Sequence, residues 1–177
     1  MTDDLQDELR RRITWVEGHA DVWRTFWDGR LFARVAAALA DPYRERGVTK
    51  VAGIEARGMI LGGAVAVELA AGFAAIRKES GLFPGPKIVR RTAADYRGQR
   101  SKLRLQRRSV GPGDRVILVD DWFETGSQAL TARAMIEEAG AEFLGSSVIV
   151  DQLSAEARAA LGDLAALIPA SALPPDG

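Results

Sequence analysis

The sequence contains no cysteine and a single histidine, His19, among its 177 residues. The absence of cysteine excludes disulfide bonds, thiolate metal sites and a cysteine nucleophile, and it is compatible with a reducing compartment. A single histidine also excludes metal sites that are built from several histidines. Composition alone therefore excludes these classes of site.

The sequence also has no uninterrupted apolar run of membrane-spanning length. The most apolar stretch, residues 59–76, contains Glu68 and is broken by glycines at positions 62, 63 and 72. A buried helix followed by a strand explains this stretch better than a membrane helix does, because a carboxylate near the centre of a span is rare. The first twelve residues are polar and charged, without the apolar segment of a secretory signal. We therefore expect no membrane partner and a cytoplasmic protein.

Composition and charge are those of a globular protein, with 47% hydrophobic and 27% charged residues and a formal net charge of zero. The length suits one compact domain with at most a small additional segment. A neutral chain is a poor general binder of nucleic acid. Between Lys78 and Arg108, however, ten lysines and arginines stand against only two acidic residues. This basic segment predicts a small polyanionic ligand, or an anionic partner, at one place on the surface.

Two strand–turn–helix units can be recognised from the pattern of apolar residues. The elements of both units are strands at 48–54, 73–77, 115–121 and 142–150, helices at 59–71 and 129–139, and turns at 55–58 and 122–128. Further helices are expected at 30–39 and 154–167. Strands that alternate with helices indicate an α/β protein with a mostly parallel sheet flanked by helices.

The same pattern divides the chain into three segments. Residues 1–30 form an N-terminal segment, residues 31–168 the core domain, and residues 169–177 a loose tail. Within the core, residues 79–102 follow neither a helical nor a strand period and contain several glycines and prolines. A long irregular stretch inside a compact domain is typical of a functional loop, so we expect a mobile basic loop here, with room for short strands at its edges.

An acid pair follows the second buried strand. Asp120 and Asp121 come directly after four apolar residues, which places them at the carboxyl edge of a parallel strand, where open α/β sheets bind ligands. The helix that follows begins with hydroxylated and small residues, and its N–H groups and dipole favour an anion; the loop consists of Glu124, Thr125, Gly126, Ser127 and Gln128. A ribose 5-phosphate fits this layout, because its hydroxyls donate to carboxylates and its phosphate accepts from amides. Alternatively, the acids form a solvated turn, or they hold Mg²⁺ through water.

This strand, acid pair and loop resemble the signature of the type I phosphoribosyltransferases, which is an apolar strand, two acids and the loop Ala-Thr-Gly-Gly-Thr. Asp120, Asp121, Thr125 and Gly126 match the signature, and Glu124, Ser127 and Gln128 depart from it. Residues 51–62, 71–78 and 82–85 are similar, in the same order and spacing, to adenine phosphoribosyltransferases, so the resemblance spans most of residues 31–153.

The resemblance implies a fold, a reaction and a cofactor. It implies a type I phosphoribosyltransferase-like core with a small N-terminal hood (residues 1–30) and a mobile basic lid (residues 79–102). The reaction it implies is Mg²⁺-dependent transfer of phosphoribosyl from 5-phosphoribosyl-1-pyrophosphate to a purine base in purine salvage. Adenine is the leading candidate for that base, and the products are then AMP and pyrophosphate. Related enzymes are commonly homodimers. Two alternatives stay open: another base, or a non-catalytic regulator that senses the phosphoribosyl donor.

The resemblance also assigns a pyrophosphate site. The turn of Glu55, Ala56, Arg57 and Gly58 corresponds to the pyrophosphate loop, with Arg57, Arg77 and Lys78 as its cations. Arginine can clamp two phosphate oxygens and lysine acts as a point charge, while glycine permits a close approach of the ligand. A solvated strand end is the alternative for Arg77 and Lys78.

The lid and the hood carry the remaining assignments. Asp95 with Tyr96 stands where the related lids have a Glu-Tyr pair that assists proton handling on the base, and a solvated loop is the alternative. Trp23 and Arg24 best match the aromatic–arginine pair that closes over the base. The alternative for the hood aromatics is packing of the hood onto the sheet.

Overall fold

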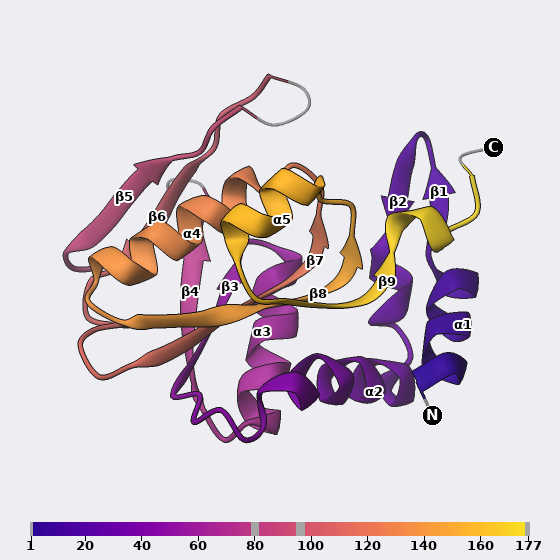
Figure 1. The fold of residues 1–177 in the computed structure, drawn as a ribbon, viewed down its shortest axis with the longest axis horizontal. Coiled ribbons are helices and arrows are strands. Elements are labelled where there is room, and N and C mark those ends of the chain that lie inside the picture. The colour runs from indigo at the N-terminus through magenta and orange to yellow at the C-terminus, as the bar shows by residue number, and fades with distance from the viewer. Residues whose placement is uncertain (1, 79–81, 95–97, 176–177) are drawn as a thin grey trace.

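A seven-stranded sheet forms the centre of the molecule (Figure 1). The computed structural model describes residues 2–78, 82–94 and 98–175. The strands lie in the order β5-β6-β4-β3-β7-β8-β9. Their bounds are β3 Lys50–Ile54, β4 Gly72–Arg77, β5 Lys87–Arg91, β6 Lys102–Gln106, β7 Arg115–Phe123, β8 Glu142–Asp151 and β9 Leu164–Pro169.

The five strands β4, β3, β7, β8 and β9 are parallel, and β6 and β5 complete the sheet as antiparallel strands. β7 is buried on both faces from Val116 to Val119, as expected for a central strand covered by helices on both sides. The prediction of an α/β protein with a mostly parallel sheet is confirmed.

Helices cover both faces of this sheet. α2 (Gly29–Ala40) and α3 (Arg57–Glu68) pack on one face, and α4 (Ser127–Glu138) and α5 (Ala155–Leu161) pack on the other. Asp28 begins α2 by accepting hydrogen bonds from the backbone N–H groups of Arg30 and Leu31 at 2.9 and 3.1 Å. Among the described residues, none of the helices has the length and apolar character that crossing a membrane requires.

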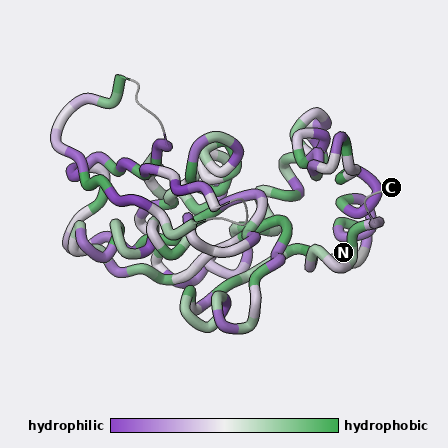
Figure 2. The backbone as a smooth tube through the Cα atoms, turned by 90° about the horizontal axis from the view of Figure 1, so that it is seen from above, coloured by the Kyte–Doolittle hydropathy of each residue, from purple (hydrophilic) through white to green (hydrophobic). Residues whose placement is uncertain are grey.

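The hood lies at one end of the molecule, where Figure 2 also shows both chain ends. It consists of α1 (Thr2–Arg12), a hairpin of β1 (Thr14–Val16) and β2 (His19–Asp21), and the 3₁₀ turn η1 (Val22–Thr25). Leu5, Leu9 and Ile13 attach the hood to the same core that holds α2 and α3.

Part of the tail that was expected to be loose is packed against the hood. It contains the 3₁₀ turn η3 (Ala170–Ala172), followed by the buried Leu173. The indole Nε1 of Trp15 donates a hydrogen bond to the carbonyl of Pro174 at 2.7 Å. One further 3₁₀ turn, η2 (Asp41–Tyr43), follows α2.

Two sequence expectations differ from the structure. The loop expected at 122–128 is shorter, because Trp122 and Phe123 continue β7 and pair with β8. The helix expected at 154–167 ends at Leu161, where Gly162 takes a φ of +88° that favours glycine. The chain then forms β9, which pairs in parallel with β8. The short strands for which the sequence left room at the edges of the basic loop are present as β5 and β6, which pair in antiparallel fashion.

Candidate functional site

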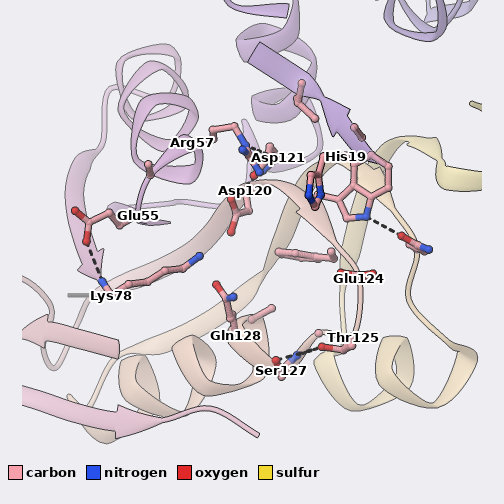
Figure 3. A pocket seen from close by; sticks show the side chains of 18 of the residues that line it. His19, Glu55, Arg57, Lys78, Asp120, Asp121, Glu124, Thr125, Ser127 and Gln128 are labelled. Carbon is pink, nitrogen blue, oxygen red and sulfur yellow. Dashed lines mark hydrogen bonds and ion pairs between the residues drawn. The ribbon is translucent and has the colours of Figure 1, made fainter. Parts of the chain in front are cut away.

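A cavity of about 560 Å³ opens at the carboxyl edge of the sheet, between the sheet and the hood (Figure 3). Its size is that of a small-molecule site. Five parts of the chain line it: the β1–β2 hairpin with Val22, the turn after β3, the end of β4 at Lys78, the end of β7 with the start of α4, and Gln152 after β8. The cavity therefore brings together segments that lie far apart in the sequence.

The acid pair, Asp120 and Asp121, lines this cavity (Figure 3). Asp121 is only 5% exposed, and its Oδ2 accepts a hydrogen bond from Arg57 Nε at 2.5 Å. Asp120 as a whole residue keeps some exposure, but its carboxyl packs closely against Gly58 at the start of α3, and its Oδ1 accepts from the backbone N–H of Asp121 at 2.9 Å. Burial raises the pKa of the Asp120 carboxyl well above its ordinary value, and the neighbouring Asp121 charge raises it further, whereas Lys78 opposes the rise. The pair is thus suited to bind hydroxyl donors or a cation.

The loop between β7 and α4 forms an anion cradle, which we define as residues Glu124, Thr125, Gly126, Ser127 and Gln128, and all five line the cavity. Gly126 precedes α4 with a left-handed φ of +75°, a conformation that glycine adopts without strain. The hydroxyls of Thr125 and Ser127 lie 3.2 Å apart. Because the first N–H groups of a helix lack intrahelical partners, this end of α4 favours an anion.

The turn after β3 supplies the opposite side of the cavity. Glu55, Ala56 and Arg57 line it, and the peptide bond between Glu55 and Ala56 is cis. Gly58 lies behind this lining, so close to β7 that a Cβ on it would meet Asp120 Oδ1 at 2.6 Å. The absence of a side chain at Gly58 thus lets α3 begin directly beside the acid pair.

The two cations at the end of β4 have different positions. Lys78 lines the cavity and extends its side chain into it (Figure 3). Arg77 is not among the lining residues; its guanidinium donates to Glu55 Oε1 at 3.1 Å and to the carbonyl of Leu82 at 3.2 Å. Glu55 Oε2 also accepts from the backbone N–H of Lys78 at 3.0 Å. Glu55 therefore orients the end of β4 relative to the cavity.

The hood residues named from the sequence as base contacts lie outside the cavity lining. Trp23 packs its ring near the Arg57 guanidinium, and Arg24 donates to Thr14 Oγ1 at 3.1 Å. Their role as base contacts stays a prediction. Asp95, named for proton handling, lies outside the described residues.

Sequence reasoning did not assign to the site several residues that line the hood end of the cavity, among them Trp15, which it left open with the other hood aromatics, and His19, Trp122 and Gln152. The rings of Trp15 and Trp122 meet edge-on with centroids 6.2 Å apart, and Trp122 Nε1 donates to Gln152 Oε1 at 2.9 Å. Trp122 could have been found from its position directly after the acid pair. Nothing in the sequence pattern distinguishes Trp15, His19 or Gln152, because only the tertiary fold brings them to the cavity.

In the part of the chain that the structure describes, no cluster of three or more potential metal ligands of the His, Cys, Asp and Glu types is present. The residues that are present nevertheless suit Mg²⁺ brought by a phosphorylated ligand. Mg²⁺ keeps several waters and is commonly held by one or two carboxylates together with substrate phosphates. Asp120 and Asp121, facing the same cavity as the anion cradle, supply such carboxylates.

Comparison with known proteins agrees with this geometry. Residues 26–160 match the family described as phosphoribosyl transferase domain. The chain is 40% identical over 131 residues to the adenine phosphoribosyltransferase of Dinoroseobacter shibae, covering 74% of this chain and 72% of the relative. It is 38% identical over 158 residues to that of Mesorhizobium japonicum, covering 85% and 86%. The structure is similar to that of the Giardia lamblia enzyme complexed with 9-deazaadenine, with a TM-score of 0.81, 28% identity and coverage of 93% and 97%.

Proposed function

The chain belongs to the phosphoribosyltransferase domain family, and from this premise we propose that it transfers phosphoribosyl from 5-phosphoribosyl-1-pyrophosphate to adenine, giving AMP and pyrophosphate. One observation carries the proposal. A single cavity contains an acid pair, an anion cradle at a helix N-terminus, and the cations Arg57 and Lys78. These groups match the hydroxyls, the 5-phosphate and the diphosphate of one donor molecule.

Each part of the donor has a complementary set of groups. The vicinal hydroxyls of the ribose donate to Asp120 and Asp121, and the 5-phosphate accepts from the N–H groups and hydroxyls of the anion cradle. The diphosphate lies toward the turn after β3, near Arg57 and Lys78. Arg77, which Glu55 holds at the cavity edge, contributes positive charge from further away.

The reaction forms a bond between a base nitrogen and the anomeric carbon and breaks the bond from that carbon to pyrophosphate, and the base gives up a proton. The protein needs no nucleophile of its own. Its residues orient the two substrates and stabilise the charge that develops on the leaving group. Asp120 and Asp121 would hold Mg²⁺ together with the substrate phosphates, and the bound ion would supply further charge neutralisation. Asp95 in the lid stays the proposed residue for proton handling.

The base lies toward the hood end of the cavity, where Trp15, His19 and Trp122 offer ring surfaces. The indole N–H groups of Trp15 and Trp122 are already donated to Pro174 and Gln152. The two tryptophans therefore present ring surface rather than donors, which suits a flat heterocycle.

We also propose a homodimer and a cytoplasmic location. Within the apolar segment of α3, Leu61 and Val65 are buried in the core, whereas Ile60 and Val67 are exposed, together with Phe73 of β4. This apolar patch favours association with a second copy. Light scattering should report a dimer that Val67→Lys converts to a monomer, whereas Val16→Lys, at another exposed valine, leaves the mass unchanged.

The proposed location follows from the donor. Because 5-phosphoribosyl-1-pyrophosphate carries several negative charges and does not cross membranes, the reaction takes place in the cytoplasm, where cells make the donor.

The test of the function is product formation. The protein is incubated with the donor, Mg²⁺ and adenine, guanine or hypoxanthine in turn, and nucleotide and pyrophosphate are quantified. We expect AMP formation to be the fastest, and Asp121→Asn to abolish most of it. A preference for another purine would move the base assignment only. Calorimetric binding of the donor without turnover on any base would indicate the regulator instead.

A further inference from the structure

The Arg57 guanidinium is held between an acid and an aromatic ring. On one side, its Nε donates to Asp121 Oδ2 at 2.5 Å. On another, its Cζ lies 5.7 Å from the centroid of the Trp23 ring, within the range of a cation–π contact. Arg57 comes from the turn after β3 and Trp23 from the hood, so this contact joins two parts of the chain that the sheet does not connect.

Trp23 is itself fixed in position by its own segment. Its backbone N–H donates to Asp21 Oδ1 at 3.2 Å. Its ring meets Phe26 edge-on at 5.7 Å, and Phe26 in turn meets Phe32 of α2 at 5.5 Å. These contacts form a line from α2 through Trp23 to Arg57.

Trp23 lies outside the lining of the cavity in which the purine base is proposed to bind. The residue is 40% exposed and is not among those that line the cavity, whereas Arg57 is. The ring therefore contacts a residue that lines the cavity, Arg57, without lining the cavity itself. The Arg57 side chain is itself 36% exposed, and a long side chain of this kind loses considerable rotamer freedom when it is held in one position.

We propose that Trp23 is a positioning residue for the phosphoribosyl donor: it holds the Arg57 guanidinium at the acid pair, ready to meet the diphosphate. This inference rests on the proposed function and extends it to a residue outside the cavity. It assigns Trp23 to the donor side of the reaction rather than to the base.

The experiment compares Trp23→Ala with Trp27→Ala. Trp27 is a matched control, because it lies in the same segment, is 71% exposed, and contacts a different arginine, Arg24, at 5.9 Å. We expect Trp23→Ala to raise the KM for the donor roughly two- to fivefold, the size of an exposed cation–π contact. The kcat and the KM for adenine should stay unchanged, and Trp27→Ala should match the wild type in all three parameters.

Three further variants distinguish the aromatic face of Trp23 from its bulk and test its dependence on Arg57. Trp23→Phe keeps an aromatic face and should restore part of the donor KM, whereas Trp23→Leu keeps an apolar side chain without the face and should behave like Trp23→Ala. In an Arg57→Ala background, Trp23→Ala should have no further effect on the donor KM, because its partner is gone.

Several outcomes would overturn the proposal. A rise in the KM for adenine would make Trp23 a base contact, and equal effects of Trp23→Ala and Trp27→Ala would indicate general packing of the hood. The dissociation constant of the donor, measured by calorimetry, keeps the test separate from turnover. Wild-type protein that binds the donor without forming product refutes the proposed function alone. Equal donor affinity in wild type and Trp23→Ala, or no donor binding at all, refutes the role of Trp23.

Discussion

Replacing Gly58 by alanine tests whether the start of α3 must lie directly against the acid pair. A Cβ at Gly58 would stand 2.6 Å from Asp120 Oδ1, 3.0 Å from Asp120 Cγ and 3.1 Å from the carbonyl oxygen of Val119. The last of these is a backbone atom of β7, a strand that is paired on both sides, so it cannot move aside freely. The new methyl group must therefore displace the Asp120 side chain or the turn that precedes α3.

The expected size of the effect follows from this geometry. Overpacking of a well-filled site costs about 1–3 kcal/mol, of which the higher helix propensity of alanine returns roughly 0.5–1 kcal/mol. The net loss of about 0–2.5 kcal/mol lowers the melting temperature by at most a few degrees per kcal/mol for a chain of this length. The effect on activity should be larger, because misplacing a reacting group by roughly an ångström can cost about a hundredfold in rate.

Gly63→Ala provides the matched control within the same helix. A Cβ at Gly63 meets nothing within 4 Å, so this change should stabilise the protein by about 0.5–1 kcal/mol and leave activity intact. The assays are AMP formation at saturating adenine and thermal unfolding at one fixed protein concentration. A Gly58→Ala enzyme that retains its kcat/KM within about twofold, well short of the loss expected for a displaced carboxylate, would refute the reasoning.

Three further predictions concern the acid pair and the core. Asp121→Asn removes the charge that pairs with Arg57, so steady-state kinetics should show turnover about a hundredfold lower while the circular dichroism spectrum stays native; unchanged turnover would place the site elsewhere. The raised pKa of Asp120 means that its contribution to stability is fully present below the ordinary aspartate pKa and is lost as pH rises through the raised value. Asp120→Asn should therefore flatten that fall in urea unfolding measured across a pH series, and an unaltered slope would contradict the assignment. Tyr43→Phe deletes the buried hydrogen bond from the hydroxyl to the carbonyl of Ser146 at 2.7 Å, so it should cost about 1–3 kcal/mol in chemical denaturation with kcat retained.

The lining of the cavity shows where sequence reasoning succeeds. Asp120, Asp121 and the anion cradle lie close together in the sequence. A buried strand followed by the start of a helix places them at one sheet edge, independently of the fold of the rest of the chain. The predictions at Arg77, Trp23 and Arg24 are of a different kind. Arg77 and Trp23 each stand next to a lining residue in the sequence, and Arg24 follows Trp23, but the three side chains are directed to other partners, namely Glu55, Arg57 and Thr14.

By itself, the sequence determined the parallel core, the acid pair and the cradle, because local periodicity and neighbouring residues suffice to specify them. Only the tertiary structure decided that the segment after Gly162 joins the sheet as β9, since a short apolar run pairs according to the strand edge that is available. It also decided that the hood presents Trp15 and His19 to the cavity and Trp23 to Arg57. These contacts join residues far apart in the chain, and the packing that creates them has no local signature.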